Sequence, residues 1–141
     1  MVNPAQAVPG PKRVLVVDDE PSIRDVVSDF LSLEGYETRE ASNGREALAL
    51  VDTWRPDAIV LDLMMPVMNG WAFAEAAAQR LGPDAVPIVV ASASMDLARA
   101  AAELQQYGVR ASLAKPFDLE VLLVVIRRLV ERTTADAWPA A

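Results

Sequence analysis

Five short apolar runs alternate along the chain with five segments whose apolar residues recur at helical spacing. Most of the runs are continuous stretches of valine, leucine and isoleucine, which is typical of strands buried on both faces. Strands that alternate with helices in this way form a parallel sheet with helices on both sides. We therefore predict strands over residues 13–18, 36–41, 58–61, 87–91 and 109–114, and helices over residues 22–34, 43–52, 69–81, 95–107 and 117–132.

The length of the chain suits one domain. Its 141 residues lie near the commonest size for a single hydrophobic core. No repeat, linker or low-complexity block interrupts residues 12–132, which we predict to be the domain. Residues 1–11 are expected to be a flexible N-terminal tail and residues 133–141 a C-terminal tail, with no second domain after the last helix.

Composition narrows the chemistry and the partners. A net charge of −7 without any histidine argues against a nucleic-acid surface, because phosphate backbones require clustered Lys and Arg. The absence of cysteine excludes disulfides, zinc–thiolate sites and thiol nucleophiles, so a bound metal would need oxygen ligands. No signal-peptide pattern opens the chain, and no apolar stretch approaches the ~20 residues of a membrane helix. We expect a cytoplasmic protein that contacts neither nucleic acid nor membrane directly.

Polar residues stand where the predicted strands end. Asp18 and Asp19 close the first strand, Asp62 follows the third, Ser92 the fourth and Lys115 the fifth. In an open parallel sheet the functional crevice lies beyond the carboxyl ends of the strands. We therefore expect these side chains to converge.

Helix capping is the competing explanation, and it accounts for only part of this set. Either Asp19 or Glu20 suits a cap before Pro21, but the second acid has no capping task, and Asp62 is too far from Asn69 to cap that helix. Converging carboxylates would repel each other by roughly 4 kcal/mol per close pair at an effective dielectric of about 20. They must therefore protonate or bind a cation, and oxygen ligands of this kind favour Mg²⁺.

Four ordered motifs give the chain a family resemblance. They are VLVVDDE from residue 14, DLMMP from residue 62, ASA from residue 91 and KPF from residue 115. The set resembles the receiver domain of response regulators in two-component signalling, of the stand-alone, chemotaxis-regulator-like kind, over about residues 13–132. The resemblance implies a flavodoxin-like (βα)5 fold, with a doubly wound five-stranded parallel sheet in strand order 2-1-3-4-5. Pro116 is expected to follow a cis peptide, as it does in many members of the family.

The resemblance also implies a role for each polar position. Asp62 would be the phosphoacceptor, Ser92 would contact a phosphoryl oxygen, and Lys115 would pair with the phosphoryl group. Four groups would hold Mg²⁺: the carboxylates of Asp18, Asp19 and Asp62 and the backbone carbonyl of Met64. A sensor histidine kinase or a histidine phosphotransfer protein would supply the phosphoryl group. The chemistry agrees, because phosphoryl transfer needs mainly positioning and charge neutralisation.

Other functions fit less well. An aspartate-nucleophile phosphohydrolase would need a second aspartate two positions after Asp62 as general acid, where this chain has Met64. We therefore expect a switch that phosphorylates itself rather than a turnover enzyme. An FMN carrier would place its phosphate against three consecutive acids from Asp18 to Glu20. A receiver fold that serves only as an unphosphorylated interaction module remains open.

The route by which the signal leaves the site is also open. The last helix is a candidate surface for a homodimer, because a helical wheel places Val121 with the buried face and leaves Leu123 and Val124 apart from it. Many receiver domains carry Tyr or Phe three positions before the lysine, whereas this chain has Ser112. We therefore expect phosphorylation to move the loop after Ser92 and the helix over 95–107, with little change at Ser112. Trp54 and Trp71 are expected to pack at the surface or at an edge.

Overall fold

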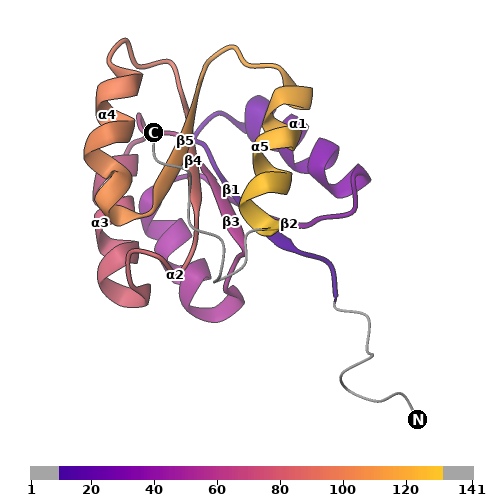
Figure 1. Cartoon of the computed structure of the whole chain (residues 1–141), viewed down its shortest axis with the longest axis horizontal. Helices are drawn as coiled ribbons and strands as arrows, with labels where there is room; N and C mark the ends of the chain where they lie inside the picture. Colours follow the sequence, from indigo (N-terminus) through magenta and orange to yellow (C-terminus); the bar gives the residue numbers. More distant parts are fainter. Residues whose placement is uncertain (1–9, 132–141) are drawn as a thin grey trace.

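A computed structural model describes residues 10–131 as five strands and five α-helices in strict alternation (Figure 1). The predicted tail at 133–141 and nearly all of the tail at 1–11 lie outside the described residues. The strands are β1 Arg13–Val17, β2 Glu37–Ala41, β3 Ala58–Leu61, β4 Ile88–Ser92 and β5 Val109–Ala114. The helices are α1 Pro21–Leu33, α2 Gly44–Trp54, α3 Gly70–Leu81, α4 Leu97–Leu104 and α5 Leu119–Glu131. None of the helices within residues 10–131 has the length and apolar character needed to cross a membrane.

The sheet has the predicted topology. Its strands run parallel in the order β2-β1-β3-β4-β5, so β1 and β3 are neighbours at its centre. Val17 pairs with Leu61 at the carboxyl ends of these two strands, directly before Asp18 and Asp62. The flavodoxin-like fold is therefore confirmed, and the two acids leave the sheet side by side.

Two apolar layers hold the helices on the sheet. In Figure 1, α2, α3 and α4 cover one face, and α1 and α5 cover the other. The first layer includes Leu61 and Phe73, and the second includes Val16, Leu31 and Ile126, each at most 1% exposed. Burial of strands on both faces explains why their sequences lack alternation.

The last two helices are shorter than the sequence predicts. α4 ends at Leu104 and continues as one 3₁₀ turn, Gln105–Tyr107, before β5. α5 begins two residues after the predicted start, because the Asp118 side chain caps it and accepts a hydrogen bond of 2.8 Å from the Glu120 N–H. The peptide between Lys115 and Pro116 is cis, as expected.

Three predictions of exposure are wrong. Leu123 is 3% exposed, whereas Val121 is 48% exposed, so only Val124 of the predicted pair faces solvent. The reason is that α5 packs against α1 as well as the sheet, which places Leu123 in one cluster with Val27. Trp54 is also buried, because it packs in one apolar cluster with Val51 and Ile59, and its indole N–H donates to Glu37 Oε1 at 3.4 Å.

Candidate functional site

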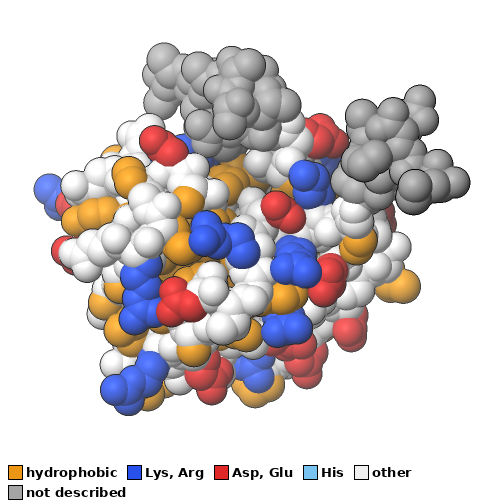
Figure 2. All heavy atoms as spheres, turned by 90° about the horizontal axis from the view of Figure 1, so that it is seen from below, with side chains coloured by type: hydrophobic (Ala, Val, Ile, Leu, Met, Phe, Trp, Pro, Cys, Tyr) orange, Lys and Arg blue, Asp and Glu red, His pale blue; other side chains and the backbone are white. Residues whose placement is uncertain are grey.

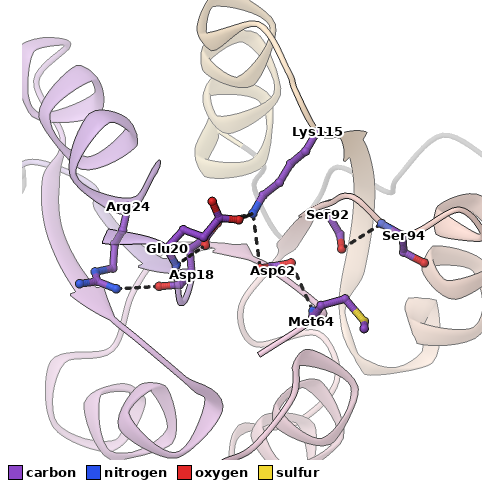
Figure 3. A network of polar contacts seen from close by, with 8 residues as sticks. All are labelled: Asp18, Glu20, Arg24, Asp62, Met64, Ser92, Ser94 and Lys115. Carbon is purple, nitrogen blue, oxygen red and sulfur yellow. Dashed lines mark hydrogen bonds and ion pairs between the residues drawn. The ribbon is translucent and has the colours of Figure 1, made fainter. Parts of the chain in front are cut away.

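Four of the predicted site residues meet beyond the carboxyl edge of the sheet (Figure 3). Asp18 follows β1, Asp62 follows β3 and Ser92 ends β4, and all three are at most 5% exposed. Lys115 follows β5, and its side chain is 10% exposed. The strand order determines this convergence, because it places the ends of β1, β3 and β4 in succession.

Lys115 is the electrostatic centre of the site. Its ammonium group lies 2.8 Å from Asp18 Oδ2, 3.4 Å from Asp62 Oδ2 and 3.7 Å from Glu20 Oε1. Burial alone would lower the pKa of Lys115, but the hydrogen bond and charge of Asp18, together with Asp62, outweigh burial and raise it. Lys115 is therefore a firmly charged group that neutralises part of the acidic set.

Asp62 combines burial with two donors. The N–H of Met64 donates a hydrogen bond of 3.2 Å to Asp62 Oδ1, and Lys115 approaches the other oxygen. Burial is the main cause that raises the pKa of Asp62 above its ordinary value, while the charge of Lys115 acts in the opposite direction. A carboxylate that is poorly hydrated and held by two donors is suited to act as a positioned nucleophile.

Asp18, Asp19 and Glu20 form a compact set of oxygen ligands. One carboxylate oxygen from each lies within 4.8 Å of the others. Asp18 is buried, Asp19 is more exposed and Glu20 is exposed. Carboxylates at such spacing fit an oxygen-preferring divalent cation such as Mg²⁺, which also keeps several waters. The residues present therefore suit the expected ion, and Asp62 supplies a further carboxylate on the neighbouring strand.

The cap interpretation fails at Glu20. This residue occupies the N-cap position of α1, but its side chain makes no capping hydrogen bond. Its carboxylate lies toward Lys115 instead, and its N–H donates 2.9 Å to Asp18 Oδ1. Glu20 is thus a member of the site that the sequence did not assign a role.

Ser92 ties β4 to β5 at the site. Its backbone carbonyl accepts a hydrogen bond of 3.0 Å from the N–H of Lys115. Its hydroxyl accepts a weak hydrogen bond of 3.4 Å from the N–H of Ser94, so the hydroxyl and the start of the β4–α4 loop are in contact. A movement of this hydroxyl would pull on that loop.

Close backbone packing fixes the loop after β3. The N–H of Gly70 donates 2.9 Å to the Leu63 carbonyl, and a β-carbon added to Gly70 would lie only 2.5 Å from the Asp62 carbonyl oxygen. Gly70 therefore lets the start of α3 approach the strand end that carries Asp62. Within the same loop, Val67 has φ of +68° and its side chain is 74% exposed.

Arg24 enters the same network from α1, although no pattern in the sequence predicts this. Its Nη1 donates a hydrogen bond of 2.8 Å to the backbone carbonyl of Asp18, as Figure 3 shows. Its Nε lies 3.2 Å from Glu40 Oε1 on β2. Glu40 is 16 residues away on another element, and the six-residue separation between Arg24 and Asp18 matches no helix or strand period, so local patterns do not reveal either contact.

This fold and site belong to a known class of signalling domain. The sequence model of the response regulator receiver domain matches residues 14–127, and the chain belongs to that family. It is a receiver domain of the response regulators of two-component systems.

Relatives agree on this assignment. The response regulator MprA of Mycolicibacterium vanbaalenii is 43% identical over 126 residues, which are 89% of this chain and 53% of the relative. The chain thus spans about half the length of the curated relatives it matches. The chemotaxis protein CheY4 of Vibrio cholerae is 36% identical with a TM-score of 0.76, covering 85% of this chain and 99% of that one. A Francisella receiver domain is 30% identical with a TM-score of 0.77, covering 86% of this chain and 98% of that one.

Proposed function

We propose that this receiver accepts a phosphoryl group on Asp62 and passes the signal on through a conformational change. The observation that carries the proposal is the buried Asp62 carboxylate, which is 3.4 Å from the Lys115 ammonium and next to Asp18 on the neighbouring strand. In a catalytic sense Asp62 is the nucleophile, while Lys115 and Ser92 are placed to bind the oxygens of the incoming group.

The proposed transfer is a substitution at phosphorus. One oxygen of Asp62 forms a bond to phosphorus, and the bond between phosphorus and the histidine nitrogen of the donor breaks. The electron pair of that bond stays on the imidazole, and the product is an acyl phosphate on Asp62. Nothing is oxidised or reduced. Lys115 balances the negative charge that the phosphoryl oxygens bring into the site.

Mg²⁺ is the cofactor that we propose, held by Asp18, Asp19, Asp62 and the backbone carbonyl of Met64. When bound, it neutralises charge on the carboxylates and on the phosphoryl oxygens. The chain's part is to keep the ligands close together. Asp18 achieves this through its carboxylate contacts with Lys115 and with the Glu20 N–H.

We propose that the donor is a histidine kinase or a histidine phosphotransfer protein. A groove of about 660 Å³ runs beside the site, between α1 and the loop before α5, and Lys115 and Glu20 stand at its edge. Its walls are mainly apolar, with Ile23, Val26 and Phe117 among them. An apolar groove of this kind suits the apolar face of an amphipathic helix, which would bring a phosphohistidine beside Asp62.

We also propose what the domain does not do and where it acts. The domain acts as a switch and not as a turnover enzyme, and it works in the cytoplasm. Nucleic acid is not a direct partner of this domain. Figure 2 supports this for one face, where basic and acidic side chains are intermixed and form no continuous basic patch. A homodimer through α5 would now involve Val121 and Val124, because Leu123 is in the core.

Incubation with Mg²⁺ and acetyl phosphate, read by intact mass, tests the proposal. The parent protein should gain the mass of one phosphoryl group, and Asp62→Asn should gain none. EDTA should stop labelling of the parent, because the uncompensated carboxylates then repel the donor. Equal labelling of the parent and Asp62→Asn would refute the site. No labelling of the parent, by acetyl phosphate or by a phosphorylated donor domain, would favour the unphosphorylated interaction module.

A further inference from the structure

Every polar group of Asp18 is engaged. Its N–H donates 3.1 Å to the Ala41 carbonyl, and its two carboxylate oxygens accept from the Glu20 N–H and from Lys115. Its backbone carbonyl accepts from Arg24 at 2.8 Å. Of these four partners, Arg24 is the side chain that reaches back to Asp18 from helix α1.

The peptide that Arg24 holds joins two of the proposed ligands. Rotation of the Asp18–Asp19 peptide would swing both carboxylates away from a shared cation. A hydrogen bond from a charged donor to the carbonyl of this peptide opposes that rotation, and charge-assisted bonds are the stronger kind. The guanidinium therefore acts on the orientation of the ligands without touching their carboxylates.

Arg24 is itself held in place. Its side chain is 18% exposed, and its Nε lies 3.2 Å from Glu40 Oε1 on the neighbouring strand β2. The planar guanidinium has several donors in a fixed arrangement, so one group can bind the carbonyl and the carboxylate at once. A lysine has one compact charge and is less suited to hold both partners in this geometry.

We propose that Arg24, oriented by Glu40, is a positioning residue that sets the affinity of the site for Mg²⁺. The inference rests on the proposed metal site, and it assigns to the Arg24–Glu40 pair a task beyond joining α1 to β2. Residues that orient metal ligands from outside the coordination sphere typically contribute about 10-fold to 100-fold in affinity.

The sign of the effect separates positioning from simple electrostatics. Removal of a positive charge beside an acidic site should strengthen cation binding if charge alone matters. Loss of positioning should weaken it. Arg24→Gln removes the charge, so weaker Mg²⁺ binding by this variant would point to lost orientation of the ligands and not to the lost charge.

Mg²⁺ titration by calorimetry, without any phosphodonor, tests the inference. Arg24→Gln should bind Mg²⁺ about 10-fold more weakly than the parent. Arg24→Lys keeps the charge and should lie between them. Glu40→Gln should also weaken binding, but it removes a negative charge, so only the variants at Arg24 separate positioning from electrostatics. Arg99→Gln is the matched control, because Arg99 on α4 is 80% exposed and its substitution removes the same charge. It should leave the affinity unchanged.

The outcomes distinguish this inference from the proposed function. Binding within twofold of the parent by both variants at Arg24 would overturn the positioning role, even if their melting temperatures fall. If Arg24→Gln does not fold, Arg24→Lys decides, because it changes the geometry of the contact and keeps the charge. A parent that binds Mg²⁺ but is not labelled by acetyl phosphate would refute phosphorylation and leave the role of Arg24 intact. A parent that does not bind Mg²⁺ at all would refute the metal site and the inference together.

Discussion

The Lys115 ammonium lies 2.8 Å from Asp18 Oδ2, closer than to the proposed phosphoacceptor Asp62 at 3.4 Å. The shorter ion pair of Lys115 is thus with Asp18, a carboxylate that we propose as a ligand of Mg²⁺. Both carboxylates are nearly inaccessible to water, so neither can rely on hydration to offset its charge. In the absence of Mg²⁺, Lys115 provides the nearby positive charge for both.

Lys115→Met should therefore destabilise the metal-free protein. Removal of one partner from a buried ion pair typically costs about 3 kcal/mol, because the remaining charge is left uncompensated. Mg²⁺ should restore more stability to this variant than to the parent, since the ion then replaces the missing positive charge. Urea unfolding with and without Mg²⁺ measures both effects.

Lys12→Met is the control for that comparison. Lys12 is the other lysine of the chain and is exposed, so its loss should change neither the stability nor the response to Mg²⁺. If Lys115→Met is as stable as the parent without Mg²⁺, the neutralising role of Lys115 is wrong.

Val67→Gly should stabilise the protein. A φ of +68° is unfavourable for a β-branched residue, and the 74% exposed side chain gains little from packing. Relief of this strain is worth about 1–2 kcal/mol, part of which is offset because glycine has more freedom in the unfolded chain. We expect a net gain of about 1 kcal/mol in urea unfolding.

Val67→Ala separates strain from side-chain effects. Alanine keeps a β-carbon, so it should relieve less strain and gain less stability than glycine. A Val67→Gly protein that is less stable than the parent would show that Val67 makes a favourable contact that outweighs its backbone strain.

The parts of the fold that the sequence predicted follow from local rules. Continuous apolar strands such as residues 14–17 must be buried on both faces, and this alone required helices on both sides of the sheet. Convergence of Asp18, Asp62 and Ser92 followed from the rule that parallel strands end at one edge. The strand order was implied by the family resemblance that the four motifs carry.

The errors of exposure share one physical cause, which is contact between residues far apart in the chain. A helical wheel treats α5 as packed on a flat surface, but α1 also covers it and buries Leu123. Trp54 is buried with the guanidinium groups of Arg13 and Arg39 centred 5.5 Å and 5.2 Å from its ring. The contact of Arg24 on α1 with Glu40 on β2 is of the same kind, because it joins two different elements. The periodicity of apolar residues in the sequence does not predict these contacts.

The start of α2 provides a prediction of pH dependence. Asn43 Oδ1 accepts from the Glu46 N–H at 3.0 Å, and Glu46 Oε1 accepts 2.7 Å hydrogen bonds from the N–H and hydroxyl of Ser42. The backbone bond from Ser42, followed by its hydroxyl, lowers the pKa of Glu46 below the ordinary value of 4.5. Folded protein therefore holds this carboxylate ionised more firmly than unfolded protein does.

Glu46→Gln should thus be less stable than the parent at neutral pH, and the difference should shrink in acid. The stabilisation is complete above the ordinary pKa of 4.5 and is lost as the pH falls through the lowered value of the folded state. Urea unfolding of both proteins at decreasing pH measures the difference. Glu75→Gln, at an exposed position in α3, is the control. A difference that stays constant or grows in acid would contradict the linkage.

The structure sharpens the prediction about how the signal leaves the site. Ser112 pairs with Val90 in the sheet and is exposed, so no ring can turn inward at this position. Tyr107, the nearest aromatic residue in the sequence, does not fill the role of the missing ring. It lines a small cavity with Ala77 and Leu81 of α3. Ser92 remains as the link, since its hydroxyl contacts the Ser94 N–H at the start of the loop toward α4.

Phosphorylation should therefore shift the backbone from Ser94 to Tyr107 and leave Ser112 nearly unchanged. Beryllofluoride with Mg²⁺ stands in for the phosphoryl group, and backbone amide shifts recorded before and after its addition measure the response. Ser92→Ala should lose the shifts in α4, because the hydroxyl that draws the loop toward the phosphoryl group is absent. Ser112→Tyr restores a ring and should add shifts in the middle of β5. Large changes around Ser112 in the parent, with none between Ser94 and Tyr107, would show that the signal takes another route.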